Sequence, residues 1–507
     1  MKVGFRVAFV TLGLAVVASC GSGSPAPTLS QTALMDPLTC KTCHPTQFQD
    51  WSGSMHAYAT DDPVFRAMNQ RAQRETQNAL GTFCVNCHAP VAVREGKTDG
   101  TNLDGLTPSL KGITCYFCHS IESVTGTHND PLTLAANGSL FGPFSDPVPG
   151  SPHNVSYSRL LDGTTTDSAN ACGSCHDIQN LQGAHVERTF AEWTGTTLSE
   201  TPGGQSCAEC HMVASDGAVS TTTPNKIRRV HNHMFPAVDL AVGDFPAADP
   251  TDGIAPQNAA QQAATTAFLA TAIQETLCLN PVTRKLQLTL DNTGASGHSW
   301  PSGATPDRRA WVTLTAYKDD AVIYASGNTE AAGAFPSALP LEDSSPDPDL
   351  WLIRDCIYDS AGNQLQMFWQ ATTVGTSNQL PGLLIQNVND PTTYQTHFTL
   401  DYPGGATATL PDTPDHVTVA VHMKAIGDDV LASLVQSGDL DPSIPPQIAS
   451  YALGGGAVLD WTPTAANAFQ ATDAVSGAIM TCVATGAYKS NITLTTSHAR
   501  CPAAPAQ

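Results

Sequence analysis

Cys40-Lys41-Thr42-Cys43-His44 is the first of five copies of the pattern Cys-x-x-Cys-His in this chain of 507 residues. The other copies are Cys84-Val85-Asn86-Cys87-His88, Cys115-Tyr116-Phe117-Cys118-His119, Cys172-Gly173-Ser174-Cys175-His176 and Cys207-Ala208-Glu209-Cys210-His211. Two thiols three residues apart can add to the two vinyl groups of one haem, and the next residue places an imidazole under the iron. The pattern therefore predicts five covalently attached c-type haems, each with its motif histidine as an iron ligand.

Other chemistries use paired cysteines, but they fit this pattern less well. A structural zinc site would combine two Cys pairs, or one pair with distant histidines, and would not require a histidine directly after each second cysteine. A thioredoxin-like dithiol would normally occur once, after a strand. The fivefold repetition with histidine always in the same place favours haem.

The N-terminus predicts export. Lys2 and Arg6 precede a short apolar run, and the segment ends in Val17-Ala18-Ser19-Cys20, which resembles a bacterial lipobox. We expect residues 1–19 to be a signal peptide of the lipoprotein type, Cys20 to carry a lipid anchor, and 20–36 to be a flexible tether. The expected location is the outer membrane, facing the periplasm or the cell surface. An ordinary cleaved signal peptide, with Cys20 incidental, is the alternative.

Charge limits the partners. The chain has 23 Lys and Arg against 45 Asp and Glu, a formal net charge of −22. Nucleic acid and anionic membrane surfaces are therefore poor partners. Other redox proteins, such as cytochromes, quinol-linked donors or an outer-membrane conduit, are better ones, and contact with the membrane is expected only through the lipid on Cys20.

Two folded domains are expected, giving an α+β multidomain class. Residues 37–236 carry all five motifs, so the chain there is too short to build its own core and should wrap the haems with short helices and loops. Residues 237–277 should form a linker and an Ala-rich helix, Gln257 to Leu277. Residues 278–507 should form a mainly antiparallel, β-sandwich-like domain. Its clearest alternating segments are Lys285–Leu290, Trp311–Tyr317, Ala321–Tyr324, Thr396–Leu400 and Val417–His422.

Four cysteines remain outside the motifs, all of them in the β-domain. In an oxidising compartment they can form two disulfides, with three possible pairings. On sequence proximity alone we favour Cys278 with Cys356 and Cys482 with Cys501.

The stretch Cys40 to Tyr58, with Trp51-Ser52-Gly53-Ser54-Met55-His56-Ala57 beyond the first motif, resembles the opening of the cytochrome c554 family of multihaem cytochromes. Further matches are Phe141-Gly142-Pro143, Cys172–Asp177, Glu187–Trp193, Cys207–Met212 and His231–Phe235, and Gly297–Gly303 is similar to a loop in the β-domains of several such cytochromes. The best-known family member has four haems, so five is a departure.

The second axial ligand of each iron decides the chemistry. Two imidazoles give a low-potential haem that exchanges electrons and binds nothing else, whereas an open position permits reactions. Eleven histidines remain beyond the five of the motifs, enough for five further ligands. Phe48, Trp51 and Met55 recur at helical spacing, which places His56 about 18 Å from His44. His56 should therefore bind a neighbouring haem, as the corresponding residue does in the family it resembles.

Other candidate ligands follow from local context. His153 lies in a Pro-rich loop, and His233 is favoured over His231 because its flank resembles that of the family. His298, in a Gly/Pro-rich loop, should cap a haem at the domain interface. The remaining candidates for the fifth place are His128 and His185, while Met55, Met212 and Met234 are methionine alternatives. His397, His416, His422 and His498 are expected to be ordinary β-domain residues.

Three functional hypotheses remain open from the sequence. The favoured one is an electron-transfer protein, not an enzyme, with five haems each bound by two histidines. The second is an enzyme with one open haem that acts on a small nitrogen or sulfur species, with Cys84–His88 as the first suspect by analogy with the family and Arg94 near it. The third is a filament or other homo-oligomer in which a histidine crosses to the next subunit.

Overall fold

The computed structural model describes residues 29–136, 138–148, 151–200, 202–249, 251, 253, 255–292, 296–327, 347–376, 378–382, 397–454, 458–473, 475–486, 494–496, 501 and 504. The predicted signal peptide, Cys20 and the first part of the predicted tether lie outside these residues, as does His498. In the described part of the chain, no helix is both long enough and apolar enough to cross a membrane.

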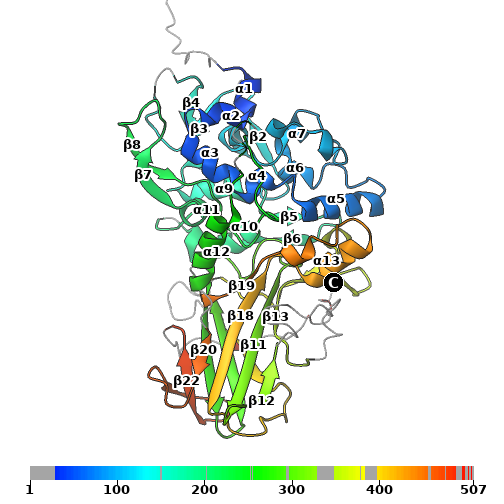
Figure 1. Ribbon diagram of the computed structural model, residues 1–507, viewed down its shortest axis with the longest axis vertical. Coiled ribbons are helices and arrows are strands. Elements are labelled where there is room, and N and C mark those ends of the chain that lie inside the picture. The colour runs from blue at the N-terminus through cyan, green and yellow to red at the C-terminus, as the bar shows by residue number, and fades with distance from the viewer. Residues whose placement is uncertain are drawn as a thin grey trace, which may run out of the picture.

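Short helices and loops make up the N-terminal region, as expected (Figure 1). Its helices are α1 (Gln31–Met35), α2 (Pro37–Lys41), α3 (Pro45–Ser52), α4 (Met55–Tyr58), α5 (Pro63–Glu75), α6 (Val85–His88), α7 (Pro90–Arg94), α8 (Cys115–His119), α9 (Ala169–Gly173), α10 (Thr189–Thr194) and α11 (Cys207–His211). Proline at the first helical position starts α2, α3, α5 and α7, where its missing N–H is not needed.

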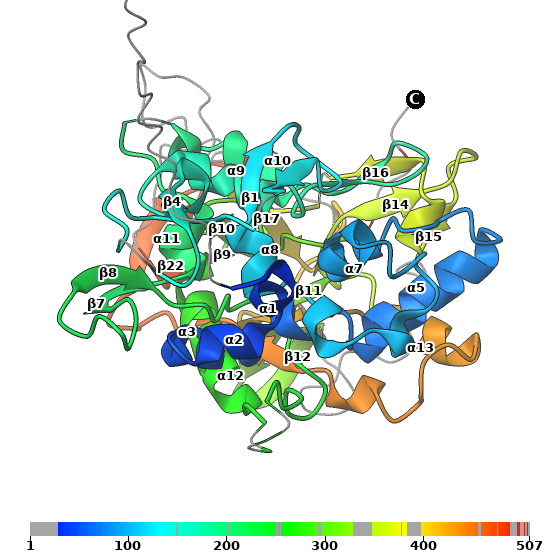
Figure 2. The same cartoon turned by 90° about the horizontal axis from the view of Figure 1, so that it is seen from above.

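Four two-stranded ribbons complete this region. They are β1 (Ile121–Val124) with β2 (Leu132–Leu134), β3 (Leu140–Gly142) with β4 (Val155–Tyr157), β5 (Ile178–Gln179) with β6 (His185–Glu187), and β7 (Ala214–Ala218) with β8 (Ile227–His231). Figure 2, viewed from above, shows β1, β4, β7 and β8 of these ribbons among the short helices. The hydrophobic residues form several small clusters here, not one large core.

Two six-stranded sheets form the β-domain. One has the order β21-β22-β9-β10-β17-β23, from Phe469–Thr472, Ile479–Ala484, Ile273–Asn280, Lys285–Asn292, His397–Tyr402 and Leu494–Thr496. The other has the order β12-β11-β18-β19, from Ala321–Ser326, Arg309–Lys318, His416–Lys424 and Ser450–Ala452, with β13 (Leu352–Ile353) and β20 (Leu459–Trp461) at its sides. All pairings are antiparallel except β17 with β23.

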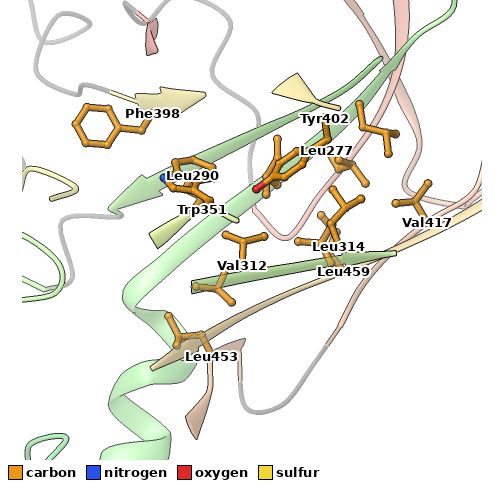
Figure 3. Close-up of a cluster of buried hydrophobic side chains, with 14 of the residues drawn as sticks. Leu277, Leu290, Val312, Leu314, Trp351, Phe398, Tyr402, Val417, Leu453 and Leu459 are labelled. Atoms are coloured by element: carbon orange, nitrogen blue, oxygen red, sulfur yellow. The ribbon is translucent and has the colours of Figure 1, made fainter. Parts of the chain in front are cut away.

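The two sheets pack face to face around one large core (Figure 3). Leu286, Leu288 and Leu290 point inward from β10, and Val312 and Leu314 point inward from β11, as their alternation in the sequence predicts. All five are at most 1% exposed. Truncation of one of the leucines to alanine would lower the free energy of unfolding by about 2–5 kcal/mol. The sandwich-like architecture expected for this half of the chain is therefore confirmed.

The Ala-rich helix is shorter than its composition indicates. We expected it to reach Leu277, but α12 spans Asn258–Ala272 and the chain continues directly as β9 from Ile273. Thr276 and Leu277 lie in β9, whose backbone pairs with β10 on one side and β22 on the other. Pairing with two strands outweighs local helix propensity here. In Figure 1, α12 stands between the helical region and the sandwich.

Part of the C-terminal half belongs to the helical region. Helix α13 (Asp428–Gln436) packs against α5, and its Val430, Leu431 and Leu434 are fully buried. The side chain of Arg71 on α5 donates to Ser433 Oγ at 2.8 Å. The domain boundary in the sequence is therefore not a boundary in space.

A polar network also joins the two halves. Arg188, just before α10, lies 2.8 Å from the buried carboxylate of Asp355, and its guanidinium donates to Gln379. Gln379 in turn donates to Glu192 on α10 at 2.8 Å. Buried charges in such a network add geometric specificity more reliably than stability, since each loses its hydration.

The favoured disulfide pairing was wrong. The structure joins Cys278 with Cys482 and Cys356 with Cys501. Proximity in sequence is a poor guide because β22 returns to lie beside β9, which sets Cys482 directly opposite Cys278. The pairing is a property of the strand order.

This connectivity gives a testable result. Digestion of the non-reduced protein should release one peptide pair containing Cys278 and Cys482 and another containing Cys356 and Cys501, identified by mass. Replacement of both Cys278 and Cys482 by alanine should lower the free energy of unfolding of the β-domain by about 2–4 kcal/mol, because the closed loop is long. A reduced and alkylated sample is the control, and a pair linking Cys278 to Cys356 would contradict the assignment.

Candidate functional site

Each Cys-x-x-Cys-His motif folds into about one helical turn. In such a turn, positions i, i+3 and i+4 lie on one face, so the two thiols and the imidazole point to the same side. The backbone N–H of His44 donates to Cys40 at 2.8 Å, and that of His176 donates to Cys172 at 3.0 Å. Helix α11 is fixed by a capping box between Ser206 and Glu209. All ten motif cysteines lie among the described residues and none is in a disulfide.

The Nδ1 atom of every motif histidine is already engaged. Four of them lie against backbone carbonyl oxygens: His44 with Val219 at 2.8 Å, His88 with Ala59 at 3.1 Å, His119 with Phe141 at 2.7 Å and His211 with Pro236 at 3.1 Å. The fifth, His176, lies 3.2 Å from the carboxylate oxygen Oε1 of Glu187. An Nδ1–H that donates to such an acceptor fixes the tautomer and leaves Nε2 free to bind a metal.

Four of the five motif imidazoles face a second imidazole. The ring centroids are 6.3 Å apart for His44 and His153, 6.2 Å for His176 and His56, 6.4 Å for His119 and His233, and 6.4 Å for His211 and His298. The second ring comes in each case from a distant part of the sequence. Four of the six candidates from the sequence, His56, His153, His233 and His298, therefore lie opposite a motif histidine.

This spacing fits an iron between the rings. Two metal–nitrogen bonds of about 2.0 Å, each with about 1.15 Å from the nitrogen to its ring centre, add up to about 6.3 Å. The Nδ1 atom of His153 is buried and has no hydrogen-bond partner, which leaves that ring available to a metal. The residues present at these four places therefore fit the axial ligand set of a haem with two histidines.

Burial keeps most of these imidazoles neutral, the form that binds metals. Burial, reinforced by the neighbouring histidines, lowers the pKa of His56 to about 3 and that of His233 to about 4, and burial together with the nearby His298 lowers the pKa of His211 to about 4. At His176, whose side chain is 52% exposed, desolvation also acts to lower the pKa, but the hydrogen bond and charge of Glu187, together with the neighbouring Cys175 and Cys172, outweigh it and raise the pKa to about 9. The fourth motif thus has an electrostatic environment unlike that of the others.

His88 is the exception among the motif histidines. Within the described ranges, no second imidazole faces it at the spacing of the four pairs. Its ring stacks instead on Phe65, with ring centroids 3.9 Å apart. Neither sequence candidate for this place reaches it: His185 hydrogen-bonds the buried carboxylate of Asp177, and His128 contacts Thr127 in a turn.

The histidines expected to be ordinary behave so where they are described. His422 stacks on Trp311 in the second sheet, and His416 lies 2.7 Å from Asp460. His397 is buried in the first sheet. Since histidine rings occupy the four facing positions, the methionines Met55, Met212 and Met234 are not needed there.

Arg94 is also not available to the second motif. Its guanidinium forms a 2.8 Å ion pair with Asp130 and lies over the ring of Phe117. Asp130 is only 5% exposed at its side chain, so the pair is a structural contact.

The motif cysteines contact one another across motifs. The thiol of Cys40 interacts with that of Cys115, that of Cys87 with Cys175, and that of Cys172 with Cys207. Cys118 is close enough to Cys172 and Cys175 to interact electrostatically with both. These interactions link the first motif to the third, the third to the fourth, and the fourth to both the second and the fifth.

One short segment organises three of the sites. His233 faces His119, the Phe235 ring packs against His56 with ring centroids 4.3 Å apart, and the Pro236 carbonyl accepts from His211. Phe235 has φ +48°, a left-handed conformation that non-glycine residues rarely adopt. The flank of His233 predicts it as a ligand, but the sequence gives no role to Phe235 or Pro236 themselves.

Some residues that contact the motif histidines were not identified from the sequence. Phe268 on α12 stacks parallel to His211, with ring centroids 5.5 Å apart, and Phe65 does the same for His88. Glu187 stood inside a stretch that resembles the family but had no assigned function. A phenylalanine or a glutamate carries no local signal of such a contact, because the contact depends on tertiary placement.

Comparisons with known proteins concern the family and the fold. Residues 39–120, which contain the first three motifs, match the family described as cytochrome c554 and c-prime. The fold is similar to the crystal structure of a penta-haem cytochrome c552 from Thermochromatium tepidum, with a TM-score of 0.56 and 17% sequence identity over 86% of this chain and 100% of that chain. No curated protein matches the chain. The family match over residues 39–120 supports a multihaem c-type cytochrome, and the structural match extends the similarity of the fold to most of the chain.

Proposed function

We propose that this cytochrome is an electron-transfer protein with five haems, four of them bound on both sides by histidine. The observation that carries the proposal is the set of four imidazole pairs at 6.2–6.4 Å. Bound haem supplies a one-electron iron couple at each motif. The paired imidazoles fill both axial positions, so they favour electron exchange and exclude substrate from the iron.

The contacts between motif cysteines support a continuous route. The thioether sulfurs would place the edges of neighbouring haems side by side in the line from the first motif through the third to the fourth. From the fourth motif the route divides, since Cys175 contacts Cys87 of the second motif and Cys172 contacts Cys207 of the fifth. His298 brings the end at the fifth motif against the β-domain.

The partners are proposed from charge and from the N-terminal sequence. A net charge of −22 favours redox proteins with basic or weakly charged docking surfaces. Export with a lipid on Cys20 would hold the protein at a membrane surface, where it could exchange electrons with other cytochromes, quinol-linked donors or an outer-membrane conduit. Support for this location comes from the sequence of residues 1–20.

A second activity is proposed for the second motif alone. His88 lacks a facing imidazole within the described residues, and the motif lies in a small apolar cluster that includes Phe65, Val85 and Leu106. A haem held here would have a position open to a small ligand such as nitric oxide or hydroxylamine. A second copy of the chain could also fill that position with one of its own histidines.

Haem counting and spectroscopy test both parts of the proposal. The purified oxidised protein should contain five haems per chain, and low-temperature electron paramagnetic resonance should show four of them as low-spin and one as high-spin. Nitric oxide should change the signal of the high-spin haem alone, because the other four irons have two imidazoles each. Five low-spin haems that ignore nitric oxide at every protein concentration would contradict the open site, and fewer than four low-spin haems would contradict the electron carrier.

The contribution of the β-domain is tested by a substitution. His298→Ala should convert the haem of the fifth motif from low-spin to high-spin, since the described structure offers no other imidazole opposite His211. Added imidazole should restore the low-spin signal. The matched control is His422→Ala, a β-domain histidine that contacts Trp311 and Thr313 instead of a motif. An unchanged spin state in His298→Ala would rule out this ligand.

A further inference from the structure

The group that accepts the hydrogen bond from His176 Nδ1, in the fourth motif, differs in kind from the acceptors at the other four motif histidines. A backbone carbonyl carries a partial charge, whereas the Glu187 carboxylate carries a full one and makes a charge-assisted hydrogen bond with His176 Nδ1. An outer-shell carboxylate makes the ligating imidazole more basic, and hydrogen bonding in this shell is one of the main influences on haem reduction potential.

Glu187 is held in place by its surroundings. It ends strand β6, where it pairs in register with Ile178 of β5, two residues after His176. The backbone N–H of Phe190 donates to the carbonyl of His176 at 3.0 Å, which ties the strand end to the motif from the other side. The Glu187 side chain is only 13% exposed, so water screens its charge weakly.

The charge of Glu187 is not cancelled by a basic side chain. In the described part of the chain, no Lys or Arg lies within ion-pair distance of it. Its neighbour Arg188 is directed toward Asp355 and Glu192. The charge of Glu187 also reaches Cys87 and His88 of the second motif, but its hydrogen bond is with the imidazole of His176.

We propose that Glu187 is a positioning residue that lowers the reduction potential of the haem on the fourth motif. The inference rests on the proposed function, in which His176 and His56 bind that haem. Reduction adds one electron to the iron and removes one positive charge from the site. A carboxylate bonded to the proximal imidazole stabilises the more positive, oxidised state and so disfavours this step.

The position of the fourth motif among the others makes its reduction potential important for electron transfer along the haems. The fourth motif adjoins the second, third and fifth through its cysteines. A low potential at this junction makes the fourth haem a step that electrons cross without accumulating, so they distribute toward the three branches. Electrons would come to rest on the haems of the branches.

The test uses the full-length, haem-loaded protein and compares three variants with the unmutated chain. Glu187→Gln keeps the size and an acceptor oxygen but removes the charge. Glu187→Asp keeps the charge but withdraws it from the imidazole. Glu209→Gln is the matched control, because this glutamate lies inside the fifth motif yet bonds the backbone N–H of Ser206 and not a motif imidazole. The five one-electron couples are measured by spectroelectrochemical titration, after haem content and spin state have been checked.

One couple should move to higher potential in Glu187→Gln. We expect about a tenfold change in its ratio of oxidised to reduced haem at fixed potential, which corresponds to about 59 mV for a one-electron couple. The resonance g-values of one low-spin haem should change with it. Glu187→Asp should move the same couple upward by less, and it decides the question if Glu187→Gln does not take up five haems.

The measurements separate a failure of the Glu187 proposal from a failure of the proposed electron-transfer function. If the unmutated protein holds five haems but no couple moves in the Glu187 variants by more than in Glu209→Gln, the role of Glu187 is overturned and the electron carrier stands. If the unmutated protein lacks four low-spin haems, the proposed function fails and the inference fails with it.

Discussion

Four of the five motif histidines face a second imidazole, and the arrangement of the N-terminal region follows from holding these pairs together. His44 and His153, or His119 and His233, belong to segments with no secondary structure in common, yet their rings lie 6.3–6.4 Å apart. The helices and ribbons of the N-terminal region are too short to pack as a conventional core. Their task is to hold pairs of rings at a fixed distance, so loops serve as well as helices.

The second half of the chain takes part in that task. His298 from the β-domain faces His211, and Phe268 of the connecting helix stacks on the same ring. The network around Arg188 and Asp355 fixes the relative position of the two halves. The sandwich, with its large apolar core, thereby supplies rigidity to a haem-binding region that has only small apolar clusters of its own.

The five motifs are alike in sequence but not in environment. Four proximal imidazoles lie against backbone carbonyls and one lies against a carboxylate, while a different one lacks a facing imidazole among the described residues. If all five haem sites were identical, no difference between them would favour electron flow in one direction. Differences in the second ligand and in the group behind the first are the means by which a protein assigns separate roles to identical cofactors.

The sequence by itself determined the cofactor, because covalent attachment and the first ligand depend on residues that are neighbours along the chain. It also determined the sandwich, since alternation with period two is a local pattern, and it identified His56, His153, His233 and His298 from their local context. Tertiary structure alone decided which ring faces which motif, that His88 faces no imidazole among the described residues, that Cys278 bonds Cys482, and that Glu187 lies behind His176. These contacts join residues far apart in the chain, and their partners are fixed by the path of the backbone between them, which no short pattern encodes.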